Sequence, residues 1–235
     1  MNVRDPETVS TPAQAVPAEP SCSLLGTTAL LFEAPGTAMT LETQQLIWSL
    51  AELTQEWPEI LESVPGMNNL MLVFRQPPPR HLQILQDRLM QAWRQLKPRL
   101  KEGRIIELPV VYGGEGGPHM ADVMAHTGLS LDEVVARHVA PTYTVYALGS
   151  HPGYCYLGGM DPAIATPRRK VPVLSIPSGA VSIGGFQTGV SASAGPSGWN
   201  TLGSTRMVFF DVHRPSPALL QPGDRVRFTV EQVIR

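Results

Sequence analysis

Glycine and proline crowd into one part of this chain. Residues 149–203 contain 11 Gly and 6 Pro in 55 positions, with only four charged side chains. In a helix interior a Gly costs about 1 kcal/mol and a Pro about 3 kcal/mol relative to Ala, so this stretch is not expected to be helical. Because the glycines follow no strict period, a coiled coil, a helical bundle and collagen are excluded. The stretch instead predicts short strands joined by tight turns.

Strand-like segments are interleaved with these turns. Four short apolar runs stand out: YTVYAL (143–148), VPVLSI (171–176), VSIGGF (181–186) and MVFFDV (207–212). Runs of β-branched and aromatic residues bounded by Gly and Pro are typical of strands. We therefore expect a β-barrel with a loop-rich mouth.

The first half of the chain alternates helical and strand-like patterns. The expected strands are 23–33, 70–74 and 105–113, and the expected helices run from Thr40 to Trp57 and over Leu82–Leu100. Two short helices should follow at 119–126 and 131–138, the second with a capping box of Ser130 and Glu133. The alternation predicts a small α+β layer with helices on one sheet face.

Three regions result from this division. Residues 1–22 lack aromatic side chains and are rich in Pro, Ala, Thr and Ser, which predicts a disordered tail. Residues 23–104 are assigned to the α+β domain and residues 105–235 to the barrel. The fold class is therefore α+β.

The charge and cysteine content narrow the class of protein. With 18 Lys and Arg against 20 Asp and Glu, the net charge is −2 and indicates no attraction to nucleic acid or anionic membranes. No apolar run approaches the length of a membrane span, and the first 20 residues lack the apolar core of a secretory signal. Cys22 and Cys155 are too few for a disulfide scaffold or a zinc site, so we expect reduced thiols in the cytoplasm.

Common catalytic signatures are missing. There is no G-x-S-x-G elbow, and we expect Cys155 to be a packing residue. The glycine run 113–117 resembles a phosphate cradle, but no G-x-x-x-x-G-K-[ST] motif follows it, and helix capping explains it better. The spacing of His119, His126 and His138 does not match a zinc site, so surface or capping roles are expected.

Basic residues are concentrated in 88–104. A single tryptophan, Trp93, does not form the aromatic interleaving that base stacking needs, which favours a solvated helix face over a nucleic-acid surface. A partner-docking surface is the less favoured alternative.

The glycine-rich stretch also holds the candidate site residues. Arg168 and Arg169 lie in a loop with few carboxylates nearby, and a guanidinium group matches a carboxylate or phosphate bidentately. These two and Gln187 are the candidates for direct chemistry. The candidates for substrate binding are His151, Gly153, Tyr156, Ser178, Gly184, Gly185 and Thr188. The alternative, a tight barrel that needs glycine at its corners, stays open on spacing alone, and no metal ligand is assigned.

The same segments resemble a known family. LGSHPGYCYLGG (148–159), DPAIATPRR (161–169), IPSG (176–179) and VSIGGFQTG (181–189) are similar to signatures of the family of the 5-oxoprolinase B subunit. This family also includes allophanate hydrolase subunit 1, the C/D part of carboxyltransferase domains and the histidine-kinase inhibitor KipI. The resemblance extends over about residues 24–230 in consistent order.

The resemblance implies a fold and a reaction. The expected fold is a small ferredoxin-like domain followed by a cyclophilin-like β-barrel. The expected reaction is the ATP-dependent opening of 5-oxoproline to glutamate by a heteromeric complex, with this chain inactive alone. The implied partners are a carboxyltransferase A/B-type subunit, similar to the 5-oxoprolinase C subunit, and a LamB/YcsF-type subunit. ATP with Mg would bind in the complex, and this chain carries no biotin-attachment signature.

Several positions depart from the family pattern. The family usually has an aromatic residue at Ser150, an acidic residue at His119 and a Tyr-Pro pair at Ser191-Ala192. These changes affect pocket shape and polarity more than the fold, which leaves another amide, urea-like or carboxylated substrate open. Two other functions also stay open: inhibition of a sensor histidine kinase, as by KipI, and a carboxyltransferase or allophanate hydrolase role in urea metabolism.

Overall fold

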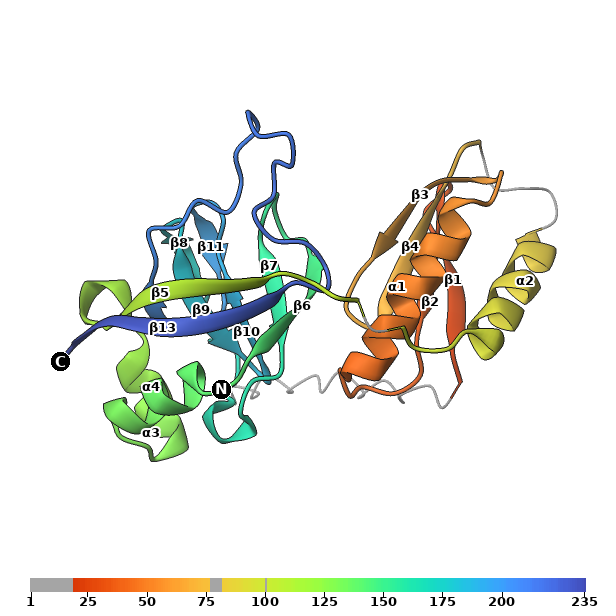
Figure 1. Cartoon of the computed structure of the whole chain (residues 1–235). Coiled ribbons are helices and arrows are strands. Elements are labelled where there is room, and N and C mark those ends of the chain that lie inside the picture. Colours follow the sequence, from red (N-terminus) through yellow and green to blue (C-terminus); the bar gives the residue numbers. More distant parts are fainter. Residues whose placement is uncertain (1–18, 77–81, 100) are drawn as a thin grey trace, which may run out of the picture.

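The computed structural model describes residues 19–76, 82–99 and 101–235, which form two lobes (Figure 1). The N-terminal lobe is a four-stranded sheet with two helices, and the C-terminal lobe contains a closed seven-stranded barrel. The expected tail lies outside the described residues for positions 1–18, as does the triple proline at 77–79. Its assignment up to residue 22 is wrong at the end, because Ser21 and Cys22 pair with Glu33 and Phe32.

The N-terminal lobe is an antiparallel sheet in the order β1-β2-β4-β3. Its elements are β1 (Ser21–Leu25), β2 (Ala29–Glu33), α1 (Leu41–Gln55), β3 (Ile60–Pro65), β4 (Asn69–Phe74) and α2 (Leu82–Gln95). Thr40 caps α1 by accepting a hydrogen bond from the Thr43 amide, as its position before the helical stripe predicts. The run 23–33 is a hairpin rather than one strand, since Gly26 turns the chain with φ 63°.

The strand order bears on the expected ferredoxin-like domain. A β-α-β-β-α-β unit ends with a strand after its second helix. Here no strand of the N-terminal sheet follows α2, because the chain continues into the barrel. Instead two strands, β1 and β2, precede the first helix. The structure thus has an α+β lobe with two helices and four strands, in a different chain order.

The barrel strands follow the order β10-β7-β6-β13-β5-β12-β9. They are β5 (Ile105–Gly113), β6 (Tyr143–Leu148), β7 (Cys155–Gly158), β9 (Ala180–Gly184), β10 (Gln187–Val190), β12 (Asn200–Ser204) and β13 (Arg225–Ile234). Helices α3 (Met120–Thr127) and α4 (Leu131–Val139) lie together at the lower end of the barrel in Figure 1. A separate ribbon pairs β8 (Val173–Ile176) with β11 (Gly195–Ser197). The capping box of Ser130 and Glu133 is confirmed.

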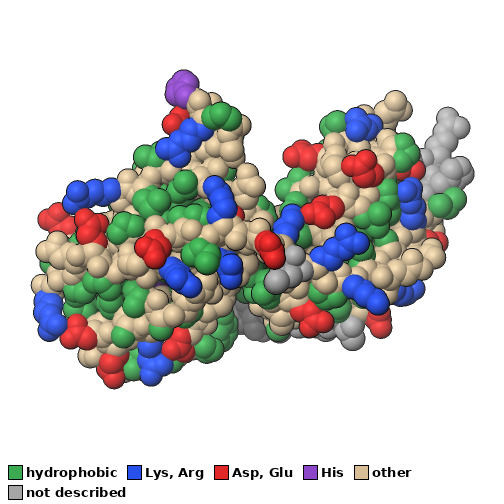
Figure 2. Space-filling model, in the orientation of Figure 1, with side chains coloured by type: hydrophobic (Ala, Val, Ile, Leu, Met, Phe, Trp, Pro, Cys, Tyr) green, Lys and Arg blue, Asp and Glu red, His purple; other side chains and the backbone are tan. Residues whose placement is uncertain are grey.

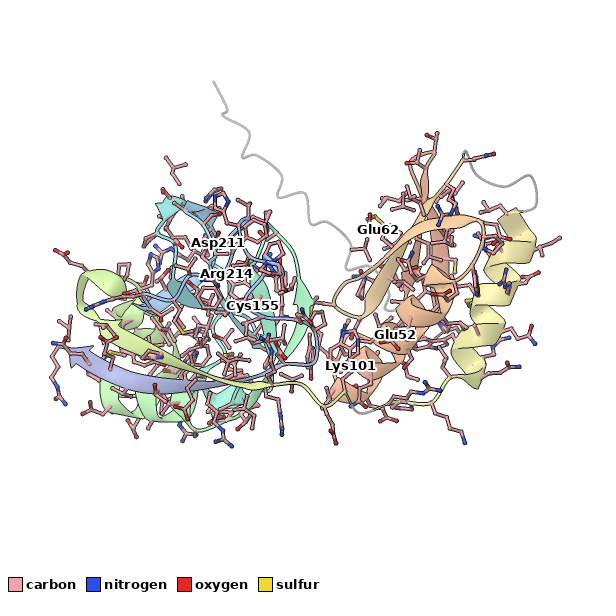
Figure 3. All side chains as sticks on the ribbon, turned by 45° about the horizontal axis from the view of Figure 1, so that its top comes forward. Glu52, Glu62, Lys101, Cys155, Asp211 and Arg214 are labelled. Carbon is pink, nitrogen blue, oxygen red and sulfur yellow. The ribbon has the colours of Figure 1, made fainter. Side chains whose placement is uncertain are left out.

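One expected strand is wrong. Residues 207–212 form no strand, and only an isolated bridge joins Phe210 to Ala218. Asp211 explains the turn, because its carboxylate accepts from the His213 amide and lies 3.3 Å from Arg214 Nε (Figure 3). The barrel is closed instead by β13, which runs parallel to β5 and for which no strand was expected, although Val226, Phe228 and Val230 alternate with polar residues.

His138 lies inside the barrel and not at the surface, which corrects the expected surface or capping role. Its side chain is fully buried, with Nδ1 2.7 Å from the Tyr112 hydroxyl and Nε2 2.9 Å from Thr188 Oγ1. Thr188 Oγ1 also donates to the Ser182 carbonyl. This chain of hydrogen bonds is satisfied when Tyr112 donates to Nδ1 and Nε2–H donates to Thr188, so the imidazole is neutral.

The two lobes meet at a bulge in β6. The pairing of β6 with β7 shifts register between Val145 and Ala147, and the carbonyl of the intervening Tyr146 accepts hydrogen bonds from α1. Trp48 Nε1 donates at 2.9 Å and Gln44 Nε2 at 3.2 Å, and both side chains are buried. A bulge frees a carbonyl that a regular ladder would have used. The lobes are therefore joined by a main-chain acceptor on one side and two side-chain donors on the other.

A second set of contacts is made by the linker, the segment between α2 and β5 that joins the lobes. Lys101 Nζ lies 2.8 Å from Glu52 on α1, and both residues lie next to each other in Figure 3. Arg104 pairs with the buried carboxylate of Asp224, so the linker is held at both ends.

On the face that Figure 2 shows, basic and acidic side chains are interspersed over both lobes. No described helix has the length and apolar character needed to cross a membrane.

The bulge contact yields a prediction. Trp48→Phe removes the Nε1–H donor and leaves the Tyr146 carbonyl with Gln44 alone, so we expect a loss of about 1 kcal/mol in the free energy of unfolding. The loosened lobes should also expose the segment that links them, and trypsin should cut faster after Lys101. Trp93→Phe is the matched control, because its ring packs on Phe32 within one lobe. Equal cleavage rates in the two variants would contradict the prediction.

Candidate binding site on the outer face of the barrel

A cavity of about 200 Å³ lies on the outer face of the barrel. It is bordered by the loop before β7, the strand β7 and the segment from β11 to β12. The lining residues are Ser150, His151, Tyr154, Tyr156, Arg168, Ile176, Ser191, Pro196, Ser197, Gly198 and Trp199. No Asp or Glu belongs to this lining as far as the chain is described, and one arginine does. The charge of the cavity therefore favours an anionic ligand.

Three aromatic rings line one side of the cavity. Tyr154 and Tyr156 stack edge to face at 4.8 Å between ring centroids, and their centroids lie 6.2 and 6.1 Å from that of Trp199. Trp199 is 6% exposed, and the Arg168 guanidinium lies 5.7 Å from the centroid of its ring. Burial raises the pKa of Tyr154, so its hydroxyl stays protonated. The cluster gives a flat apolar surface next to one cation.

A tight loop holds His151 at the edge of the cavity. The Gly149 amide donates to the Tyr154 carbonyl, and the Tyr154 amide donates back to the His151 carbonyl, which closes the loop. Ser150 within it has φ 63°, a conformation that non-glycine residues rarely adopt. The imidazole Nε2 accepts from the amides of Ala192 and Ser193 at 3.1 and 3.3 Å. Burial lowers the pKa of His151, which keeps the ring neutral near pH 7.

Three of the ten predicted site residues line this cavity: His151, Tyr156 and Arg168. They come from the loop before β7, from β7 itself and from the loop after the Pro162–Ile164 turn. Their meeting depends on the pairing of β7 with β10 and of β9 with β12. Ser178 does not belong to the lining, and its hydroxyl donates to the carbonyl of Ala192, which follows the lining residue Ser191.

Arg169 does not share the place of Arg168. Its guanidinium forms an ion pair with Asp122 of α3, and its amide donates to the Gly198 carbonyl. The expectation that both arginines lack carboxylate partners is therefore corrected for Arg169. The partner lies 47 residues away in sequence, so spacing alone did not reveal it. Arg169 Nε is buried without a hydrogen-bond partner among the described residues.

Thr188 and Gln187 are also placed differently from the expectation. Thr188 is fully buried, and it faces His138 inside the barrel because side chains alternate along β10. Gln187 begins β10 opposite Gly184, outside the cavity lining, with its Nε2 buried and unpartnered within the described chain. A ligand in the cavity is thus not in contact with Thr188.

The candidate glycines are explained by contacts within the protein and not by the approach of a ligand. A Cβ at Gly184 would lie 2.8 Å from the Trp199 ring, and one at Gly153 would lie 2.7 Å from Phe210 Cβ. Gly185 makes the β9–β10 turn with φ 61° and exchanges two hydrogen bonds with Thr166. The open alternative of glycines at the corners of the barrel therefore explains Gly185. Close approach of a side chain explains the other two.

The close contact between Gly184 and the Trp199 ring yields a prediction. Gly184→Ala pushes the indole away from the barrel, and overpacking of this kind costs about 1–3 kcal/mol. We expect a lower melting temperature. We also expect a changed shape of the cavity, because Arg168 and both tyrosines pack around this ring. Gly195→Ala is the control, since no atom lies within 4 Å of a Cβ there. Identical melting curves for both variants would show that the indole tolerates the methyl group.

Sequence reasoning missed Tyr154 and Trp199 as site residues. The signal available was the alternation of Tyr154, Cys155 and Tyr156 at the start of a strand, which places both tyrosines on the face opposite the cysteine. Cys155 is fully buried in the barrel core (Figure 3), and burial raises its pKa to about 12, so its packing role is confirmed. Nothing in the spacing pointed to Trp199.

The glycine run 113–117 packs closely against Leu202 and Ile234. A Cβ at Gly117 would lie 2.1 Å from the Leu202 carbonyl, and a Cβ at Gly114 would lie 2.7 Å from the Ile234 side chain. The Gly117 amide already donates to the Gly113 carbonyl. Packing of the chain against itself therefore explains Gly114 and Gly117. Among the described residues there is also no group of three or more His, Cys, Asp or Glu arranged to hold a metal ion.

Comparison with known proteins assigns the family. Residues 20–220 match the model of the carboxyltransferase domain, subdomain C and D. The chain is 44% identical to the 5-oxoprolinase B subunit of Escherichia coli O157:H7 over 211 residues, which are 90% of this chain and 96% of that protein. It is 39% identical to the 5-oxoprolinase B subunit of Haemophilus influenzae over 197 residues, which cover 83% and 90% of the two chains.

Solved structures share the fold of this chain. The crystal structure of TTHA0988 matches with a TM-score of 0.72 and 35% identity, over 87% of this chain and 40% of that chain. The Kluyveromyces lactis urea amidolyase matches with a TM-score of 0.78 over 95% of this chain and 16% of that chain; at 17% identity it shows the fold alone. The chain therefore belongs to the carboxyltransferase subdomain C and D family, together with the B subunits of 5-oxoprolinase.

Proposed function

We propose that this chain is the B-type subunit of an ATP-dependent 5-oxoprolinase, which converts 5-oxoproline, ATP and water into glutamate, ADP and phosphate. The observation that carries the proposal is the 44% identity to a 5-oxoprolinase B subunit over 96% of that protein. The substrate is a small ring that carries a carboxylate and an amide. The complex cleaves the amide and leaves the carboxylate unchanged.

The chemistry of the cavity supports a substrate of this kind. Arg168 supplies a guanidinium group for the carboxylate, and no described acidic side chain in the lining opposes it. Tyr154, Tyr156 and Trp199 offer an apolar surface for the ring. Ligand sites of this type combine apolar walls with a few polar groups that fix orientation. We therefore place the carboxylate at Arg168 and the ring against the aromatic cluster.

ATP and the partner subunits belong to the same proposal. ATP with Mg supplies the activation of the amide. Because the sequence has no G-x-x-x-x-G-K-[ST] motif and internal packing explains Gly114 and Gly117, we place nucleotide binding at the partner subunits or at the joint with them. The partners are a carboxyltransferase A/B-type subunit and a LamB/YcsF-type subunit. The two free cysteines agree with a complex that works in the cytoplasm.

Reconstitution tests the function. Co-expressed with both partner subunits, the chain should release glutamate and ADP in equal amounts from 5-oxoproline, and the chain alone should release neither. Turnover by the isolated chain, or a reconstituted complex that leaves 5-oxoproline intact, would overturn the proposal. Activity blocked by avidin would indicate a biotin-dependent carboxyltransferase of urea metabolism. Tight binding to a sensor histidine kinase without ATP would indicate a KipI-like inhibitor.

A further inference from the structure

The hydrogen bonds of His151 assign its two ring nitrogens. Nε2 accepts from two consecutive main-chain amides, those of Ala192 and Ser193. An N–H at this position would point its hydrogen at two other hydrogens, so Nε2 carries no proton in this arrangement. The neutral ring then carries its proton on Nδ1. In the described part of the chain the ring bonds only through Nε2, which leaves Nδ1–H for a ligand.

We infer that His151 is a specificity-determining residue, a neutral donor that hydrogen-bonds the acyl oxygen of the bound ring through Nδ1–H. This inference rests on the proposed function, because it takes 5-oxoproline as the ligand. Arg168 holds the carboxylate at one end of the cavity, and His151 selects a hydrogen-bond acceptor on the ring. Arg168 and His151 both belong to the lining of the cavity, which contains no described carboxylate.

The arrangement explains which molecules the cavity rejects. A proline carries a protonated amine and no ring carbonyl, so it would leave Nδ1–H unpaired and bring a cation to a site with no described acidic residue. A donor that the bound ligand covers without pairing it costs about 1–3 kcal/mol. A saturated carbocycle with the same carboxylate would meet only the first of these penalties. Discrimination between 5-oxoproline and cyclopentanecarboxylate therefore isolates the hydrogen bond.

The protonation state can be observed directly on the full chain. Long-range proton–nitrogen NMR at about pH 7.5 should show His151 with a protonated Nδ1 and an unprotonated Nε2. Addition of 5-oxoproline should shift the Nδ1 signal, and cyclopentanecarboxylate at equal saturation should shift it less. An Nε2-protonated ring, or a charged ring, would overturn the inference whatever the complex does.

Two substitutions separate donation from loop support. His151→Gln can place its amide oxygen where Nε2 lies and so keep the bonds from Ala192 and Ser193, but it has no donor at the position of Nδ1. We expect unchanged stability and a KM for 5-oxoproline raised about 10-fold in the reconstituted complex, as for the loss of one hydrogen bond. His151→Asn can restore a donor near Nδ1 and loses the loop acceptor. It should keep selectivity and melt earlier.

The outcomes distinguish the inference from the proposed function. Wild-type selectivity of His151→Gln would show that the residue only supports the loop, and would overturn the inference while the complex remains an oxoprolinase. A wild-type complex without turnover refutes the proposed function. In that case selective binding of 5-oxoproline over cyclopentanecarboxylate by the chain still supports the donor, and equal binding overturns it.

Discussion

Arg168→Ala is expected to raise the KM of the reconstituted complex for 5-oxoproline by about 100-fold, which corresponds to about 2.8 kcal/mol. Arg168 is the cation that lines the cavity, and a charge-assisted bond to a carboxylate is worth about 1.5–3 kcal/mol. Arg168→Lys should recover only part of the loss, because an ammonium group lacks the planar fork of the guanidinium. Steady-state kinetics with varied 5-oxoproline at saturating ATP measures the effect.

The neighbouring arginine is the matched control. Arg169→Ala changes the same side chain one position along, but it breaks an ion pair with the exposed Asp122 instead of a cavity contact. We expect a KM near that of the wild type and a small loss of stability, since exposed pairs contribute about 0–1 kcal/mol. The sequence alone favoured a large effect at Arg169. If Arg169→Ala and not Arg168→Ala abolishes activity, the substrate lies on the α3 side of the loop.

Acid is expected to destabilise the fold through His138. Burial lowers the pKa of this ring from 6.5 to about 3. The unfolded chain therefore binds more protons than the folded chain between these values. Above the unfolded pKa of about 6.5, the titration of His138 does not change the free energy of unfolding. As the pH decreases below about 6.5, the free energy of unfolding falls, and this group lowers it by about 3 kcal/mol at about pH 4. The groups that face the ring are the hydroxyls of Tyr112 and Thr188 and the rings of Tyr143 and Phe228.

Denaturant unfolding between about pH 7 and pH 4 measures this slope. His138→Gln removes the titrating group, and its stability should fall less steeply with acid than that of the wild type, although it starts lower. NMR titration of the wild type gives a check that does not depend on a folded variant. The His138 ring should remain neutral down to about pH 5, and a midpoint near 6.5 would contradict its burial between Tyr112 and Thr188.

The predictable parts of the fold are those written in local patterns. The helical stripe after Thr40 and the capping box at Ser130 are set by neighbours three or four residues apart, and both are found. The glycine-rich stretch correctly predicted short strands and a closed barrel. Strand β13 was not expected although its residues 225–230 alternate polar and apolar side chains, and its parallel pairing with β5, about 120 residues earlier, depends on tertiary packing. Residues 207–212 had a strand-like composition, yet no neighbouring strand pairs with them.

The candidate site was predictable only in its general location. Motif likeness pointed to the stretch that holds the cavity, and His151, Tyr156 and Arg168 do line it. Which arginine faces the cavity depends on Asp122, which a helix far away in sequence supplies. The inward direction of Thr188 depends on the register of β10. Contacts of this kind arise from tertiary packing, so residue type and spacing do not determine them.

The bulge at Tyr146 has a consequence for exchanging parts between relatives. The barrel contributes a carbonyl oxygen to the joint, and every residue type has one, so changes of side chain at position 146 leave the acceptor in place. The N-terminal lobe contributes Trp48 and Gln44, whose donors depend on the side chain. A chimaera with a foreign N-terminal lobe should therefore dock on this barrel if it presents an indole and an amide one helical turn apart.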